Sequence, residues 1–261
     1  MANKKIKKKD VLPAYLMPDH LTESYLLTIS RRSFGMYAER LLDLLILAAK
    51  QETTGVFSSS ILSCTQESDD ARKIEFSVRH LLANNVDHNY ATVEQTLSQM
   101  SQFHFQIRSE EDHIFRDRQL ITDVTVYEDR HTCCIRVQPE VWEALQKREG
   151  TIRVFNPNTA YKLTSGHTYH LYKLISKQKN PITYHIEEVK KMLGCEGKYK
   201  RLNDFISRVL DPAVADLKAS ADWYFEYELK ISVERLNQRK KGRPSYDLIT
   251  FFPKRNITQM S

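Results

Sequence analysis

The sequence predicts an α+β protein built from two tandem winged-helix domains, each a group of helices followed by a small antiparallel hairpin. Both halves of the 261-residue chain have the same order of elements, with a long amphipathic helix first and a pair of strand patterns last. Turn-forming residues between Gly150 and Asn158 separate the halves. We therefore expect a basic tail at 1–25, an N-terminal winged-helix domain at 26–150 and a C-terminal one at 156–255.

The N-terminal half begins with a strong helical pattern from Tyr37 to Gln51, in which leucines and alanines recur at helical spacing. Further helices are predicted over 92–100 and over 139–147, where a proline occupies the first turn. Apolar residues alternate in the manner of strands over 73–78, 103–107, 121–126 and 133–137. Helices followed by a final hairpin are typical of a winged helix.

The C-terminal half has the order helix, short strand, helix, turn, helix and hairpin, which is that of a winged helix-turn-helix. Ser165 is expected to cap the first helix and Gly194 to end the second. Pro212 is expected either to kink the third helix or to start a new one. The expected elements are helices over 165–179, 186–193 and 198–210 and strands over 182–184, 223–232 and 246–252.

The charge is unevenly placed along the chain. Residues 156–255 contain 19 Lys and Arg against 11 Asp and Glu, a formal charge of +8, whereas 11–155 contain 15 against 21, a formal charge of −6. A basic surface attracts a polyanion such as double-stranded DNA. The C-terminal half is therefore the expected DNA-binding half. The acidic N-terminal half is expected to serve assembly, and whether it also touches the DNA backbone stays open.

The second helix of a helix-turn-helix enters the major groove. Here it is expected to start at Lys198, with its apolar stripe buried. Arginine and lysine can donate to guanine, asparagine can pair with adenine, aspartate can accept from cytosine, and serine can do either. The predicted DNA contacts of this recognition helix are Lys198, Lys200, Arg201, Asn203, Asp204, Ser207 and Arg208. The alternative is an ordinary solvated face, because charged outer faces are common on helices.

The loop between the last two strands, from Glu234 to Pro244, is strongly basic. Such a wing contacts phosphates or reaches into a minor groove. Its predicted DNA contacts are Arg235, Arg239, Lys240, Lys241 and Arg243. A merely solvated hairpin loop is the alternative. The five lysines among the first ten residues could lie on DNA or form a solvated tail.

The sequence gives little support for a zinc protein, a disulfide-rich secreted protein or a membrane protein. The four cysteines, Cys64, Cys133, Cys134 and Cys195, fit neither a zinc pattern nor a disulfide framework, so reduced thiols of a cytoplasmic protein are expected. No apolar run approaches the ~18–20 residues that a membrane span needs, and no secretion signal is expected. We expect no cofactor, no metal and no membrane partner.

Several short stretches of the C-terminal half contain specific motifs. They are Leu163-Thr-Ser165 with Leu171-Tyr172-Lys-Leu, then Ile186-Glu-Glu-Val-Lys-Lys-Met-Leu-Gly194, then Tyr199-Lys-Arg-Leu-Asn-Asp-Phe205-Ile-Ser-Arg-Val-Leu-Asp-Pro-Ala213, followed by Tyr227-Glu and Lys241-Gly-Arg243. In these motifs and their order the chain resembles the iteron-binding plasmid replication initiator (Rep) family. The N-terminal half resembles it in layout and in the helix from Tyr37 to Ala49.

The resemblance implies two winged-helix domains and a bacterial, cytoplasmic protein. It implies binding to repeated origin DNA, opening of the origin, and recruitment of the host initiator and replicative helicase. It also implies homodimers that repress their own promoter, with the first domain contributing to the dimer contact and with monomers binding the repeats.

Two alternatives remain beside this reading. A catalytic initiator of the rolling-circle type would need paired histidines for a metal and a tyrosine nucleophile, and the nine histidines include no His-hydrophobic-His pair. We therefore expect no enzymatic activity. A transcriptional regulator with two winged helices and no initiator activity would use the same fold and the same helix, and the arrangement of DNA repeats near the gene separates the two.

Overall fold

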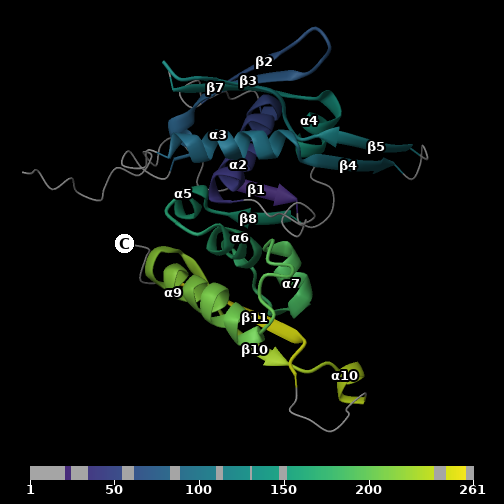
Figure 1. The fold of residues 1–261 in the computed structure, drawn as a ribbon, viewed down its shortest axis with the longest axis vertical. Helices are drawn as coiled ribbons and strands as arrows, with labels where there is room; N and C mark the ends of the chain where they lie inside the picture. Colours follow the sequence, from purple (N-terminus) through teal and green to yellow (C-terminus); the bar gives the residue numbers. More distant parts are fainter. Residues whose placement is uncertain are drawn as a thin grey trace, which may run out of the picture. The chain divides into compact units, whose positions relative to one another are not determined.

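A computed structural model of the chain describes residues 21–24, 35–54, 62–82, 89–109, 114–129, 131–146, 152–237 and 245–256. The chain divides into two compact units. The first comprises residues 1–18 and 37–148, and the second comprises 19–36 and 149–261 (Figure 1). Both units combine helices with small antiparallel sheets. The lysine-rich N-terminal tail lies outside the described residues.

The first unit contains a four-stranded antiparallel sheet with the strand order β2-β3-β7-β6. Helices α2 and α3 lie on one side of this sheet (Figure 1). A separate hairpin pairs β4 with β5. The elements in chain order are α2 (Met36–Thr54), β2 (Leu62–Gln66), β3 (Arg72–Ser77), α3 (Tyr90–Ser101), β4 (His104–Ser109), β5 (Ile114–Gln119), β6 (Thr122–Tyr127), β7 (Thr132–Val137) and α4 (Pro139–Gln146).

The apolar residues that predicted these elements form the core of the first unit. The leucines and alanines of α2 are fully or almost fully buried, as are Val93, Leu97 and Met100 on α3. On α4, Val141, Trp142 and Leu145 face inward, as their spacing predicts. The three helices predicted in this half are confirmed, with ends that differ by a few residues.

Glu52 near the end of α2 joins three elements of the first unit. It accepts a hydrogen bond from Arg72 on β3 at 2.7 Å, and others from Trp142 and Gln146 on α4. Burial raises the pKa of Glu52, but these three donors outweigh it and hold the pKa below the ordinary value of 4.5. The carboxylate therefore stabilises the first unit in its charged form.

The second unit is a winged helix with the three-stranded sheet order β10-β11-β9. Helix α9 packs along β10 and against α6 (Figure 1). The elements are β1 (Leu21–Ser24), β8 (Ile152–Phe155), α5 (Pro157–Ala160), α6 (Gly166–Ile175), β9 (Ile182–His185), α7 (Ile186–Met192), α8 (Leu202–Phe205), a π-helical turn (Ile206–Leu210), α9 (Asp211–Ser220), β10 (Trp223–Lys230), α10 (Val233–Asn237) and β11 (Leu248–Arg255).

A local sequence signal explains where α6 starts, and a buried hydrogen bond attaches this helix to the hairpin. The Ser165 hydroxyl accepts a hydrogen bond from the backbone N–H of Thr168, as expected for a helix cap. Further along α6, the buried Tyr172 hydroxyl donates to the Asp222 carboxylate at 2.5 Å, just before β10. Burial and the neighbouring carboxylate both raise the pKa of Tyr172, so it is a neutral donor. This bond ties the first helix of the domain to its hairpin.

The boundary between the halves differs from the prediction. Residues 1–25 were expected to be a tail and 150–158 a break, whereas Leu21–Ser24 form strand β1, which pairs antiparallel with β8 (Ile152–Phe155). A strand pair formed by segments so distant in the chain leaves no local signal. Residues before the first helix therefore contribute a strand to the second unit.

Candidate nucleic-acid interface

The turn between α7 and α8 is fixed by its own backbone. Gly194 and Gly197 adopt positive φ angles of 61° and 74°, which favour glycine. The N–H of Cys195 donates to the carbonyl of Lys190 at 2.7 Å, and the N–H of Lys198 donates to the carbonyl of Cys195 at 3.0 Å. Gly194 thus ends α7 as its sequence position predicts, and the chain turns sharply toward the next helix.

The buried side chain of Lys190 binds this turn through its ammonium group. Its side chain is only 8% exposed, and its ammonium group donates to the carbonyl of Tyr199 at 3.1 Å and to Glu187 at 2.8 Å. The same ammonium lies 5.9 Å from the centre of the Phe205 ring, at the start of the recognition helix. Because Tyr199 directly precedes Lys200 and Arg201, Lys190 holds these two cations in place.

Sequence reasoning missed Lys190, which was not among the predicted site residues. Its spacing contains a signal, since it lies four residues after the buried Ile186 and three before the buried Leu193. These positions share one face of a helix. A lysine on a buried face must place its charge on a specific partner.

The recognition helix starts later than predicted. Lys198 and Lys200 lie in the turn, and Arg201 occupies the N-cap position with extended backbone angles, so that the helix begins at Leu202. The prediction of a helix from Lys198 was wrong, because Gly197 and the bond from Lys198 to Cys195 form a turn there. The three cations therefore lie at the N-terminal end of the helix and not along its face.

The exposed and buried residues of the recognition helix follow the predicted pattern. Phe205, Val209 and Leu210 are buried. The polar residues predicted to face outward do so: Lys198, Lys200, Arg201, Asn203, Ser207 and Arg208 are exposed, and Asp204 is partly exposed. The structure thus gathers these seven side chains around the first two turns of one helix.

The cations of this end have no acidic partners. Among the residues that the structure describes, no salt bridge involves Lys198, Lys200, Arg201 or Arg208. By contrast, Lys230 and Lys254 on the hairpin pair with Glu228 at 3.6 Å and Glu226 at 2.5 Å. An unpaired cation keeps its charge for an external anion, because no neighbouring carboxylate neutralises it. This end of the helix is therefore the place where the described part of the second unit can best bind a polyanion.

A π-helical turn joins the two halves of this helix. The N–H of Asp211 donates to the carbonyl of Ile206, five residues earlier, just before Pro212. Proline lacks an N–H and its ring crowds the carbonyl four residues before it, which here belongs to Arg208. The wider π turn accommodates that ring, so the helix continues into α9 instead of stopping. Of the two predicted outcomes at Pro212, a local distortion within one helix is the one observed.

The wing is partly described. The expected loop from Glu234 contains a short helix, α10, whose Arg235 is exposed. The other predicted wing contacts, Arg239, Lys240, Lys241 and Arg243, lie outside the described residues. Asp247 joins the two arms of the wing at its base. Its carboxylate accepts hydrogen bonds from the backbone N–H of Ser232 at 2.8 Å and from the Ser232 hydroxyl at 2.5 Å.

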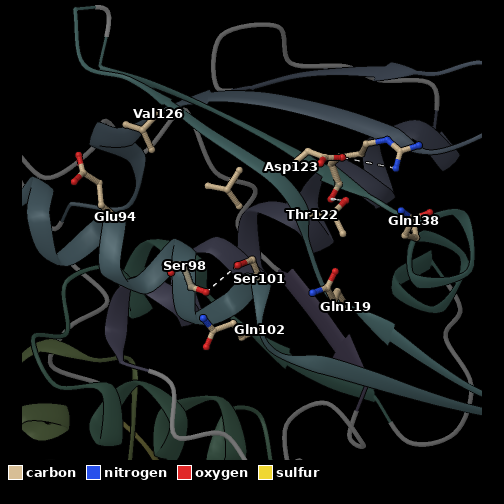
Figure 2. A pocket seen from close by; sticks show the side chains of 11 residues that line it. Glu94, Ser98, Ser101, Gln102, Gln119, Thr122, Asp123, Val126 and Gln138 are labelled. Atoms are coloured by element: carbon tan, nitrogen blue, oxygen red, sulfur yellow. Dashed lines mark hydrogen bonds and ion pairs between the residues drawn. The ribbon is translucent and has the colours of Figure 1, made fainter.

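The first unit offers a different surface. A polar groove of ≈ 650 Å³ lies between α3 and β6. Figure 2 shows Ser98 of α3, Gln102 just after that helix, and Gln119 and Thr122 around the groove. Helix α3 contains Glu94 and no lysine or arginine. Its exposed face therefore lacks the cations of the recognition helix.

The described residues contain no group of three or more His, Cys, Asp or Glu side chains that could hold a metal ion. Within the same ranges, no helix has both the length and the apolar composition to cross a bilayer. The four cysteines are free thiols, and burial raises the pKa of Cys133 to about 12 and that of Cys64 to about 11.

Comparisons with known proteins identify two winged-helix domains of one family. Residues 22–176 match the family model described as "Initiator Replication protein, WH1", and residues 185–252 match "Initiator Rep protein, WH2". No curated protein sequence gives a significant match.

Two solved structures are similar. The crystal structure of Pi initiator protein in complex with iteron DNA is 15% identical, with a TM-score of 0.63 over 90% of this chain and 97% of that one. The WH1 domain of MSBI1.176, a replication protein isolated from a multiple sclerosis patient, is 15% identical over 44% of this chain and 86% of that one, with a TM-score of 0.28. The Pi likeness shows the same fold of two winged helices. From its two matched domains, the chain belongs to the family of initiator Rep proteins.

Proposed function

We propose that this protein is a plasmid replication initiator that binds repeated double-stranded DNA at the origin through its second winged helix. The observation that supports this most directly is the group of exposed cations at the start of the recognition helix, which have no acidic partner among the residues that the structure describes. A cation in that state releases counterions from DNA when it binds, which favours association. The Pi initiator, which shares the fold, was crystallised with iteron DNA.

Roles within the interface follow from position. Asn203, Ser207 and Arg208 lie on the exposed face of the helix and are assigned to base edges in the major groove. Asp204, which is partly exposed, is a fourth candidate there. Lys198, Lys200 and Arg201 lie at the end of the helix, where backbone phosphates run beside the groove, so their role is to fix register. Arg235 and the cations from Arg239 to Arg243 are assigned to the phosphates beside the wing.

The N-terminal winged helix is assigned to assembly of a homodimer. The acidic charge of its half and the absence of lysine and arginine from α3 favour this role over an equal share in DNA recognition. Monomers would then bind the repeats, and dimers would repress the promoter of the gene. Recruitment of the host initiator and helicase, origin opening, action in the bacterial cytoplasm and the lack of any enzymatic activity complete the proposal, and they rest on the family.

The recognition-helix assignment is tested with Asn203→Ala and Ser207→Ala. Each lost base contact should cost about 1–3 kcal/mol and relax the preference for one base pair. The measurement is binding of the purified protein to duplexes with every single substitution in the protected repeat. Glu196→Gln, an exposed change in the preceding turn, is the control. Unchanged affinity and unchanged preference in both alanine variants would show that another surface reads the DNA.

Two measurements distinguish an initiator from a transcriptional regulator: which DNA sites the protein protects, and whether replication depends on the gene. Protection of several direct repeats near the gene supports an initiator, whereas protection of a single inverted repeat at the promoter supports a regulator. A circular DNA with that region should fail to replicate without the gene and replicate again when the gene is supplied on another molecule. Replication that does not depend on the gene would contradict the initiator function and favour the transcriptional regulator.

A further inference from the structure

The wing exposes apolar side chains that no part of the described structure covers. Val233 is 71% exposed and Leu236 is 44% exposed, both on helix α10, and Tyr246 on the opposite arm of the wing is 47% exposed. These three are the exposed large apolar side chains of the described ranges. Val233 and Leu236 are three residues apart and therefore project from the same side of the helix.

This short helix is held firmly on the hairpin. The carboxylate of Asp247 accepts both the N–H and the hydroxyl of Ser232, the residue before α10. The carbonyl of Ser232 in turn accepts the N–H of Leu236 at 3.0 Å, and the N–H of Asp247 donates to the carbonyl of Lys230 at 3.1 Å. The apolar pair is thus presented on a fixed support, away from the core.

The surroundings of the pair identify its partner by charge. Between residues 230 and 246 the chain contains six lysines and arginines against one acidic residue. Arg235, which lies between the two apolar side chains in sequence, is exposed and forms no salt bridge with any described residue. An apolar pair inside a basic segment suits a surface that is both anionic and able to admit apolar side chains. A DNA minor groove has both properties, since apolar wedges can enter between stacked base pairs while cations bind the phosphates.

We propose that Val233 and Leu236 form a wedge that enters the minor groove beside the recognition-helix site and unstacks a base step. The protein would then deform the duplex as it binds, which is a physical step toward strand opening. This inference rests on the proposed binding of DNA by the second winged helix. The wing would contribute deformation, while the recognition helix contributes sequence preference.

The test uses the full-length protein and the repeat duplex that it protects, with 2-aminopurine replacing single adenines across the footprint. Unstacking of a base step raises the fluorescence of the 2-aminopurine placed there. The wedge variant is Val233→Thr combined with Leu236→Asn, which keeps the shape of both side chains and makes them polar. Leu236→Met is the matched control, because it keeps an apolar side chain of similar volume at the same place. Both positions are exposed, so thermal unfolding should not change.

The parent and the Leu236→Met protein should give a fluorescence increase at one step beneath the wing. The double variant should bind the same duplex with the same base preference and lose that increase. An equal increase in the double variant, or none in the parent despite saturated binding, would overturn the wedge and leave the pair to a protein partner. Failure of the parent to bind any duplex from the region would instead contradict the proposed function, so the two failures are distinguishable.

Discussion

Replacing Lys190 with methionine separates positioning of the interface from contact with DNA. Methionine keeps an apolar side chain of similar length at this buried position but removes the ammonium group, and with it the contact to the Phe205 ring. The lost bond to the Tyr199 carbonyl involves a charged donor that is 8% exposed, and such bonds contribute about 1.5–3 kcal/mol. The pair with Glu187, whose side chain is 68% exposed, adds little because solvent screens it.

The expected result has two parts. The free energy of unfolding of the second unit should fall by about 1.5–3 kcal/mol in urea titrations. Affinity for the repeat duplex should also fall. Without the Lys190 bond, Lys200 and Arg201 are less ordered in the free protein, and ordering them on binding costs free energy. A cost of about 2 kcal/mol corresponds to roughly thirtyfold in the dissociation constant.

The dependence of binding on salt distinguishes this positioning role from a phosphate contact. The slope of log K against log salt counts the phosphates neutralised, at about 0.9 per contact. Lys190→Met should leave the slope unchanged. Lys200→Met, the control at an exposed cation, should lower the slope by about one contact and leave the unfolding free energy unchanged. A lower slope for Lys190→Met, or no loss of stability, would refute the anchoring role.

Three further predictions concern the two units separately. Tyr172→Phe removes the bond to Asp222, so the second unit should unfold at lower urea by about 1–3 kcal/mol, and an unchanged urea midpoint would contradict this. Glu52 has a folded pKa below 4.5, so its stabilisation is present above that pH and is lost as the pH falls through the folded value. Urea titrations of Glu52→Gln above and below pH 4.5 should therefore show a smaller drop than the parent, and equal drops would count against the network. Asp247→Ala removes the acceptor of Ser232, so hydrogen exchange of the α10 amides should accelerate while the core amides keep their rates. Uniform exchange rates in parent and variant would show that Asp247 does not hold the wing.

Periodic patterns predicted most of the secondary structure. The spacing in α2, α3 and α4 identified these helices, because each must bury one face against a core. In the second unit, Ser165 starts a helix and Gly194 ends one where expected, since a capping hydroxyl and a left-handed glycine act on neighbouring residues only. The exposed side of the recognition helix was equally predictable, because burying Phe205 and Val209 determines which residues face water.

Features that depend on distant residues were not predictable in this way. The strand pair β1–β8 joins two segments that lie before and after the elements of the first unit in the sequence, and no periodic signal marks such a pairing. The helix start moved from Lys198 to Leu202, because the bond from Lys198 to Cys195 and the bond from Lys190 to the Tyr199 carbonyl hold these residues in a turn. The short helix α10 depends on Asp247, fifteen residues after the Ser232 that it binds.

By itself the sequence therefore determined the class of fold, the basic half and the outward face of one helix, because charge and periodicity are properties of the chain alone. Only the tertiary structure decided that the cations at the start of the recognition helix have no acidic partner in the described ranges, that a buried lysine positions two of them, and that the wing presents an apolar pair. Each of these depends on which distant groups lie within a few ångströms, and a linear pattern does not contain that distance.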